Sequence, residues 1–185
     1  MQYPQKLEET IALPDGRNFL LRPVRPEDEP AFHAAFAKLS TEDIRMRFLH
    51  PITSLTHAMA AHLTQIDYDR EMALVLIRQA VDSRSEIDGV VRLVADPDKE
   101  RAEFAIIVSS RLIGMGIGSF MMRRMIDYAR NQGIREIVGY VLRENRRMLK
   151  LAAAFGFRVT SALDDPAVVQ VSLPLQSEDE KRLGT

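Results

Sequence analysis

One segment near the middle of the chain constrains the fold more than any other. It begins as an apolar, strand-like run at 106–108, continues as a glycine-rich loop, and opens an amphipathic helix at 118–119. Glycines in such a loop let the backbone turn with positive φ and approach a ligand closely, and the N–H groups of a first helical turn point towards an anion. The segment predicts a strand–loop–helix unit that can hold a phosphate without a basic side chain.

Three families of glycine loop share this outline, and spacing distinguishes them. A Walker loop needs Gly-Lys-Ser/Thr after four intervening residues, but counting from Gly114 the chain has Ser119 and Phe120. A dinucleotide fingerprint needs a third glycine and an acidic residue that closes the next strand, whereas here Ser119 takes the third position and Glu136 precedes the strand. The pattern that remains is the pyrophosphate loop of an acyl-CoA-binding protein, beside the alternative of a glycine-rich turn that binds nothing.

The residues after this loop extend the pattern to a β-α-β-α unit. Apolar residues at helical spacing predict an amphipathic helix over 118–132, which Gly133 ends. A buried strand is predicted over 136–142, and a second helix over 146–155.

Turn residues and apolar alternation predict an antiparallel first half. Strands are predicted at 8–13 and 18–24, joined as a hairpin by Pro14-Asp15-Gly16, at 72–78, 89–95 and 101–108, and finally at 168–173. Helices are predicted from Pro26, after a capping box of Ser40 and Asp43, and over the apolar stripe 55–66. Helices between strands indicate an α/β (α+β) fold with a mixed central sheet.

Several short motifs and this order of elements resemble one family. The motifs are Leu21-Arg22-Pro23-Val24-Arg25-Pro26-Glu27-Asp28, Arg47-Phe48-Leu49-His50-Pro51, Asp67-Tyr68-Asp69-Arg70-Glu71, Ala102-Glu103-Phe104-Ala105 and Val138-Gly139-Tyr140-Val141-Leu142-Arg143-Glu144-Asn145. From Phe19 to Leu173 the chain resembles the GNAT acetyltransferase superfamily, and within it the GNAT domain of bacterial protein lysine acetyltransferases. The resemblance implies a GNAT-type mixed sheet flanked by helices.

The resemblance also implies an activity, the transfer of an acetyl group from acetyl-CoA to a primary amine, first of all a protein lysine side chain. The amine must lose a proton before it attacks, and Glu103 is the candidate general base. Its apolar neighbours Ala102 and Phe104 predict partial burial, which would raise the pKa of the carboxyl. The other interpretation is a solvated glutamate on a strand face.

The resemblance assigns the acetyl-CoA site to residues around the glycine loop. In the superfamily two parallel strands splay apart and expose backbone groups to the pantetheine arm, and the matching segments here are 104–108 and 138–141. Asn145 matches the asparagine that meets the pantetheine, and it is also suited to capping a helix. The residues assigned to acetyl-CoA are Ile106, Ile107, Val108, Ile113, Gly114, Met115, Gly116, Ile117, Gly118, Ser119 and Asn145.

Two positions depart from the superfamily pattern. Ile113 stands where Arg or Gln is usual, which removes a side-chain donor and leaves the backbone loop intact. Ala152 stands where a tyrosine acid often lies, so the leaving thiolate would take its proton from water.

The acceptor is left open by the sequence. A small amine is an alternative to a protein lysine, and a non-catalytic acyl-CoA-binding module that regulates a partner is another. Acidic residues that could face either kind of acceptor are Glu42, Asp43, Asp67 and Asp69. Arg143, Arg146 and Arg147 could reach the 3′-phosphate of CoA or form a solvated helix face.

Composition limits the remaining function classes. The 185 residues, 46% of them hydrophobic, are enough for a single domain over 1–175, with a polar tail at 176–185. The chain has no cysteine and its four histidines are widely spaced, so we expect no metal site. A net charge of −1 without a basic tract argues against nucleic-acid partners. No apolar signal region or membrane span is apparent, so we expect a cytoplasmic protein with no membrane partner, and a homodimer stays open.

Overall fold

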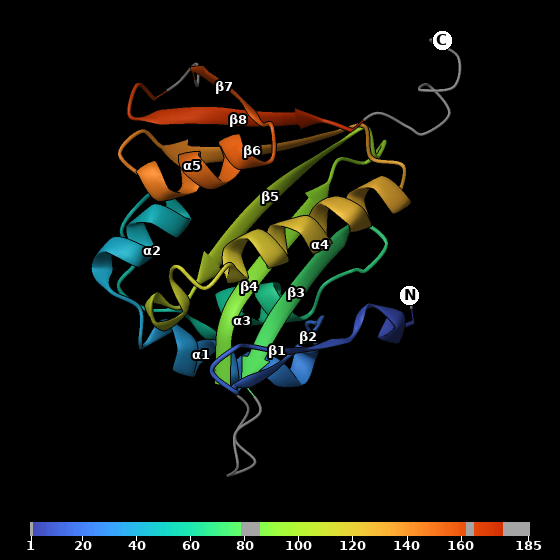
Figure 1. The fold of residues 1–185 in the computed structure, drawn as a ribbon, viewed down its shortest axis with the longest axis vertical. Coiled ribbons are helices and arrows are strands. Elements are labelled where there is room, and N and C mark those ends of the chain that lie inside the picture. Colours follow the sequence, from blue (N-terminus) through green and yellow to red (C-terminus); the bar gives the residue numbers. More distant parts are fainter. Residues whose placement is uncertain (1, 79–85, 162–164, 176–185) are drawn as a thin grey trace.

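The computed structural model describes residues 2–78, 86–161 and 165–175, which contain one eight-stranded sheet (Figure 1). The strands lie in the order β1-β2-β3-β4-β5-β6-β8-β7. Neighbouring strands are antiparallel except β5 and β6, which are parallel, so the predicted mixed sheet is confirmed. The bounds are Glu9–Ala12 (β1), Asn18–Pro23 (β2), Glu71–Arg78 (β3), Glu86–Ala95 (β4), Arg101–Val108 (β5), Glu136–Leu142 (β6), Arg158–Ser161 (β7) and Val168–Pro174 (β8).

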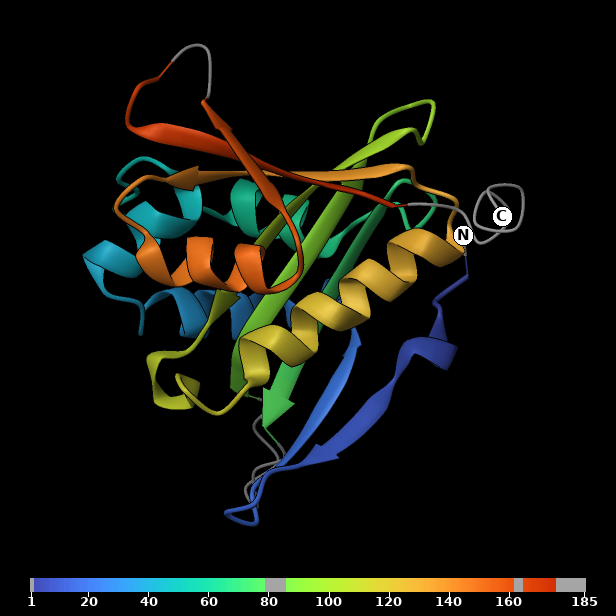
Figure 2. The same cartoon turned by 45° about the horizontal axis from the view of Figure 1, so that its top comes forward.

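Helices cover both faces of the sheet (Figures 1 and 2). On one face lie α1 (Glu29–Phe36), α2 (Thr41–Phe48) and α3 (His57–Thr64), and on the other α4 (Ile117–Asn131) and α5 (Arg146–Ala154). Short 3-10 helices span Gln5–Leu7, Pro26–Asp28 and Ser110–Leu112. The single-domain α/β architecture predicted from the sequence is therefore present.

Each face of the sheet has its own apolar core. On the α4 side, Met121, Met122 and Met125 are fully buried against the central strands. On the other side, Phe32 of α1 and Ala60 of α3 pack with buried strand residues. The three methionines belong to the apolar stripe of α4, and burial of apolar surface is favourable by about 25 cal/mol per Å². It explains why the helical period predicts α4 to within one residue at each end.

Two local predictions are confirmed by hydrogen bonds. The hydroxyl of Ser40 accepts from the backbone N–H of Asp43 at 3.0 Å, and the Asp43 carboxylate accepts from the N–H of Ser40 at 3.3 Å, which completes the capping box of α2. β1 and β2 form the predicted hairpin.

Other boundaries differ from the sequence prediction. The segment from Pro26 begins as a 3-10 turn, because the Asp28 carboxylate accepts the N–H of Arg25 at 2.8 Å, and α1 begins at Glu29. β7 was not predicted, because all four of its residues are exposed and lack apolar alternation. The predicted tail at 176–185 lies outside the described residues.

The parallel strands β5 and β6 separate early. Their register ends at Glu103 and Val138, after three paired residues. Immediately beyond, the Phe104 ring lies so close to Gly139 that a Cβ built on the glycine would be 2.4 Å from Cε1 of the ring. The segment 105–108 therefore has no strand partner on its β6 side, as the predicted splay requires.

Candidate active site

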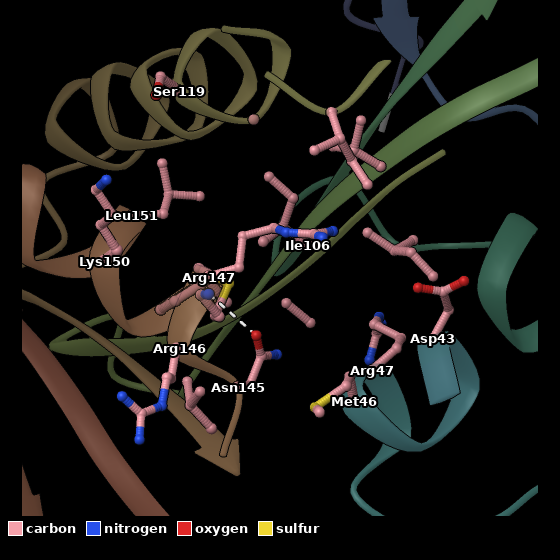
Figure 3. Close-up of a pocket in the computed structure, with 18 of the residues that line it drawn as sticks. Asp43, Met46, Arg47, Ile106, Ser119, Asn145, Arg146, Arg147, Lys150 and Leu151 are labelled. Carbon is pink, nitrogen blue, oxygen red and sulfur yellow. Dashed lines mark hydrogen bonds between the residues drawn. The ribbon is translucent and has the colours of Figure 1, made fainter. Parts of the chain in front are cut away.

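A cleft of about 870 Å³ opens where β5 and β6 separate. Its walls come from the end of β5, the loop before α4, the start of α5, and α2 (Figure 3). This volume is typical of small-molecule sites. The predicted site residues that line it are Glu103, Ile106, Ile107, Val108, Ile113, Gly114, Gly116, Ile117, Gly118, Ser119 and Asn145. The structure thus brings nearly the whole predicted set together.

The glycine loop has the geometry of an anion cradle. Gly114 and Gly116 have φ values of +80° and +77°, a conformation that glycine adopts readily and other residues rarely do. Gly116 is the N-cap of α4, and its carbonyl accepts the N–H of Phe120 at 2.9 Å. The N–H groups of 117–119 therefore precede the first intrahelical bond and have no acceptor within the helix. Together with the helix dipole they favour an anion at this end of the cleft.

Met115 is the one assigned residue that the structure does not bring into the cleft. Its side chain is 45% exposed and its sulfur contacts the Arg17 guanidinium at 2.9 Å. Its backbone N–H donates to the carbonyl of Leu112 at 3.3 Å, so this donor is already used within the loop. Because Gly114 and Gly116 both have positive φ and Met115 between them does not, the Met115 side chain turns outward.

Asn145 confirms its capping interpretation. Its side-chain oxygen accepts the backbone N–H of Met148 at 3.0 Å and caps α5 (Figure 3). Because the oxygen is engaged, the amide nitrogen is the group that this side chain can offer to a ligand in the cleft. The contact with pantetheine stays a prediction.

Glu103 lies on the face of β5 opposite to Phe104 and lines the cleft. The side chain is reachable by solvent, yet the surrounding protein raises the pKa of its carboxyl by desolvation. The guanidinium of Arg47 lowers this pKa, and the carboxylate of Asp96 raises it further. The pKa is raised in the expected direction, but the side chain is exposed, so the partial burial expected from its apolar neighbours is wrong.

Glu42 and Asp43 of α2 line the cleft, as their acidic side chains allowed, but the place of the last turn of α2 was missed. Met46, Arg47, Phe48 and Leu49 also line the cleft, and of these only 47–49 belong to a motif named from the sequence. These residues reach the cleft because α2 packs against β5, a contact between segments far apart in the chain. The signal available in the sequence was a pair of arginines, Arg45 and Arg47, that alternate with apolar residues at the end of a short helix.

The acidic loop before β3 is not part of the cleft. The carboxylate of Asp67 accepts the N–H of Asp69 at 3.1 Å, and Asp69 pairs with Lys99 at 3.2 Å. Neither aspartate lines the cleft, whereas Glu42 and Asp43 do. Of the four acidic residues named as possible acceptor contacts, Asp67 and Asp69 thus lie outside this cleft.

Cationic side chains line the α5 wall of the cleft. Arg146, Arg147 and Lys150 belong to this wall (Figure 3). Arg143 does not, because its guanidinium donates to the carbonyl of Pro166 at 2.6 Å. Two of the three arginines named from the sequence are thus placed where they can meet an anionic ligand.

The histidines lie away from the cleft. His33 and His57, far apart in the sequence, both contact the Glu29 carboxylate, with His33 Nε2 at 3.6 Å. Over the described ranges, no group of three or more histidine, cysteine, aspartate or glutamate residues is arranged to hold a metal ion. Those same ranges contain no helix with the length and hydrophobicity of a membrane span.

Comparison with known proteins decides the family. The family model described as the acetyltransferase (GNAT) domain matches residues 18–158, well over half of the chain. The chain belongs to the GNAT acetyltransferase family. This GNAT protein is accordingly an acetyl-CoA-dependent N-acetyltransferase.

Two bacterial relatives carry the same description. The acetyltransferase PA5475 of Pseudomonas aeruginosa is 32% identical over 146 residues, which cover 79% of this chain and 78% of the relative. The acetyltransferase Pat of Mycolicibacterium smegmatis is 29% identical over 142 residues, which cover 76% of this chain and 41% of the relative. The chain therefore spans less than half the length of Pat.

Solved structures share the fold. The GNAT domain of S. lividans PAT has a TM-score of 0.82 at 24% identity, covering 94% of this chain and 100% of that domain. The spermidine N-acetyltransferase of Vibrio cholerae, solved with CoA and spermine, has a TM-score of 0.66 at 19% identity, covering 84% of this chain and 95% of the other. At these identities the likeness shows the fold alone.

Proposed function

We propose that this GNAT protein transfers the acetyl group of acetyl-CoA to the ε-amino group of a protein lysine, with Glu103 as the general base. The observation that carries the proposal is the position of Glu103. Its carboxylate lines the same cleft as the glycine loop and the splayed end of β5, so a proton acceptor and an anion cradle share one cavity.

The cleft residues fit acetyl-CoA from one end to the other. The free N–H groups of 117–119 suit the pyrophosphate, and the unpaired edge of 105–108 suits the amide groups of the pantetheine arm. The amide nitrogen of Asn145 adds a donor beside that arm. Arg146, Arg147 and Lys150 supply cations suited to the 3′-phosphate. Bound there, acetyl-CoA supplies a thioester carbonyl as the electrophile.

Glu103 supplies the proton acceptor that this chemistry needs. A lysine amine has an unperturbed pKa of about 10.4, so it must lose a proton to attack the thioester at neutral pH. A raised pKa makes the Glu103 carboxylate a better base than an exposed glutamate. Glu103 takes the ammonium proton, and the neutral amine then attacks. As the N–C bond forms and the C–S bond breaks, the nitrogen loses a second proton to water. The thiolate takes its proton from water, since the buried Ala152 offers no acid.

The charges of the cleft argue against a polyamine acceptor. A polycation needs several unpaired carboxylates, but Glu42 and Glu144 both pair with Arg45, Glu42 at 3.4 Å. Asp43 is engaged as the capping residue of its own helix. Glu103 is thus the carboxylate in the described lining that has no such partner. These pairings support a single lysine amine as the acceptor, presented in an open cleft.

Mass spectrometry of acceptor mixtures tests the acceptor. The protein is incubated with deuterated acetyl-CoA, a heat-inactivated bacterial lysate and equal amounts of spermidine and free amino acids. We expect labelled acetyl groups on lysine side chains of proteins, and none with the Glu103→Gln variant. Label confined to the small amines would overturn the protein-lysine assignment. An equal amount of labelled lysine with the Glu103→Gln variant would show that Glu103 is not the general base.

A further inference from the structure

Arg47 is a cation that faces the cleft on the same side as Glu103. It lies near the end of α2 (Figure 3), which packs against β5. The side chains of Arg47 and Glu103 line one cavity. Arg47 is partly buried and reaches solvent through the cleft. Burial, and to a smaller extent the charge of nearby Arg92, lower the pKa of its guanidinium to about 10, although the carboxylate of Glu103 acts in the opposite direction. The group therefore stays charged at neutral pH in poorly solvated surroundings.

Apart from Glu103, the charged side chains around Arg47 already have partners. Arg92 donates to the carboxylate of Glu71 at 2.8 Å and also to a backbone carbonyl. Glu42 pairs with Arg45, which is on the same helix as Arg47. Arg47 itself has neither an ion pair nor a hydrogen bond with any residue of the described ranges; its contact is with the ring of Phe48, whose centroid lies 4.9 Å from the guanidinium carbon.

An unpaired guanidinium in a poorly solvated part of the cleft favours the binding of an anion. A poorly solvated charge without a counter-charge is costly, and a carboxylate that accepts two parallel N–H donors relieves the cost. Glu103 influences the pKa of Arg47 but forms no direct ion pair with it. This separation matters, because a carboxylate held by a guanidinium would be a weaker base.

We propose that Arg47 binds a carboxylate that a substrate carries into the cleft beside Glu103. The proposal rests on the proposed function, because that function makes the Glu103 side of the cleft the reacting end. A carboxylate can arrive there from two sources. One is an acidic residue next to the acceptor lysine, and the other is the far end of a dicarboxylic acyl group on CoA. In both cases the planar guanidinium of Arg47 donates hydrogen bonds to the same chemical group, a carboxylate.

Matched substrates distinguish the two sources. In the acceptor arm, the peptides Gly-Glu-Lys-Gly and Gly-Gln-Lys-Gly compete for acetyl-CoA. In the acyl arm, succinyl-CoA is compared with butyryl-CoA on the glutamine peptide. We expect the native protein to favour the carboxylate-bearing member of at least one pair by about tenfold in kcat/KM, the effect of one charge-assisted hydrogen bond. Arg47→Gln should abolish that ratio.

Two further variants complete the test. Arg47→Lys keeps the charge but not the fork, so it should keep part of the ratio, and it serves if the glutamine variant does not fold. Arg130→Gln, an exposed arginine of α4 that does not line the cleft, is the matched control and should keep the full ratio. A native protein without a carboxylate preference in either arm, or a preference that survives Arg47→Gln, would overturn the proposal.

Binding separates this proposal from the proposed function. Calorimetry gives the dissociation constants of the same peptides and of both CoA thioesters without any turnover. A carboxylate preference that depends on Arg47 in binding would support the inference even if no lysine were acetylated. Transfer to lysine without any such preference would overturn the inference alone.

Discussion

The ring of Phe104 occupies the space that a side chain at residue 139 would need. A Cβ built on Gly139 would lie 2.4 Å from Cε1 and 2.9 Å from Cδ1 of this ring. The contact lies one residue beyond the last β5–β6 pair, so the ring fills the gap between the strands as they separate. The glycine on β6 and the aromatic ring on β5 thus form one packing unit at the base of the cleft.

The first prediction concerns this unit. Gly139→Ala should destabilise the protein by about 1–3 kcal/mol, because the added methyl forces the ring out of place. It should also weaken CoA binding, since the displaced ring lies where the cleft begins. Urea denaturation and calorimetry with CoA measure the two effects.

The double variant Gly139→Ala with Phe104→Leu is the control. A smaller side chain at residue 104 should accommodate the methyl, so the combined loss should be smaller than the sum of the single losses. Simple additivity would show that the two residues do not compete for the same space.

A second prediction separates ligand binding from stability at the cradle. Gly118 is helical, and a Cβ there would meet only Leu151 Cδ2, at an ordinary 3.6 Å. Gly118→Ala should therefore keep or raise the melting temperature, because alanine favours the helix by about 1 kcal/mol. Its methyl group lies in the turn whose N–H groups suit the pyrophosphate, so CoA affinity should fall about tenfold.

Asn131→Ala, at the exposed far end of the same helix, is the matched control. It should leave CoA affinity unchanged. Equal CoA affinity in Gly118→Ala and the native protein would contradict the placement of pyrophosphate at this helix end.

A third prediction concerns Asp88, a buried carboxylate that pairs with two partly exposed arginines. Asp88 is 3% exposed, and its carboxylate accepts from Arg111 at 2.7 Å and from Arg78 at 3.1 Å. Its carbonyl also accepts the N–H of Ser109 at 2.8 Å. Asp88→Asn should cost about 1–3 kcal/mol by urea denaturation, less than a fully buried pair, because both arginines are partly exposed.

Asp15→Asn offers a comparison, since Asp15 pairs with Arg17 at the surface. Its effect on stability should be close to zero. If both variants lost the same stability, burial of Asp88 would not explain its contribution.

A fourth prediction uses the pKa of Glu103 without any substrate. Because the folded protein raises this pKa above its ordinary value of 4.5, the protonated form is favoured on folding. Stability from this group is present at low pH and is lost as pH rises through the raised pKa. Relative to Glu103→Gln, the native protein should therefore lose stability over that window in urea titrations at several pH values. The opposite slope would mean that Arg47 outweighs desolvation.

Local periodicity and turn chemistry predict most of this fold. The helix α4 follows from an apolar stripe, and the α2 cap follows from Ser40 and Asp43. The strand β7 could not be predicted, because Arg158–Ser161 is exposed throughout and is a strand only by pairing with β8. Such an edge depends on its neighbour and leaves no pattern of its own.

In the site too, local features could be predicted, whereas those that depend on distant segments could not. The cradle could be predicted, because positive φ at Gly114 and Gly116 is a local property of glycine. The place of Arg47 could not, because it depends on α2 packing against β5. That Asp69 lies outside the cleft could not be predicted either, since its partner Lys99 lies in a distant turn.

Glu103 is the proposed acceptor of the amine proton. The most direct measurement is the pH profile of kcat for native protein and Glu103→Gln on one lysine peptide, with CoA affinity measured in parallel. Because the pKa of Glu103 is raised, the native rate should rise with pH through that value. The variant should lack this limb, lose about 10²–10⁴-fold in turnover at neutral pH, and bind CoA as the native protein does. Near-native turnover of Glu103→Gln at neutral pH would contradict the account.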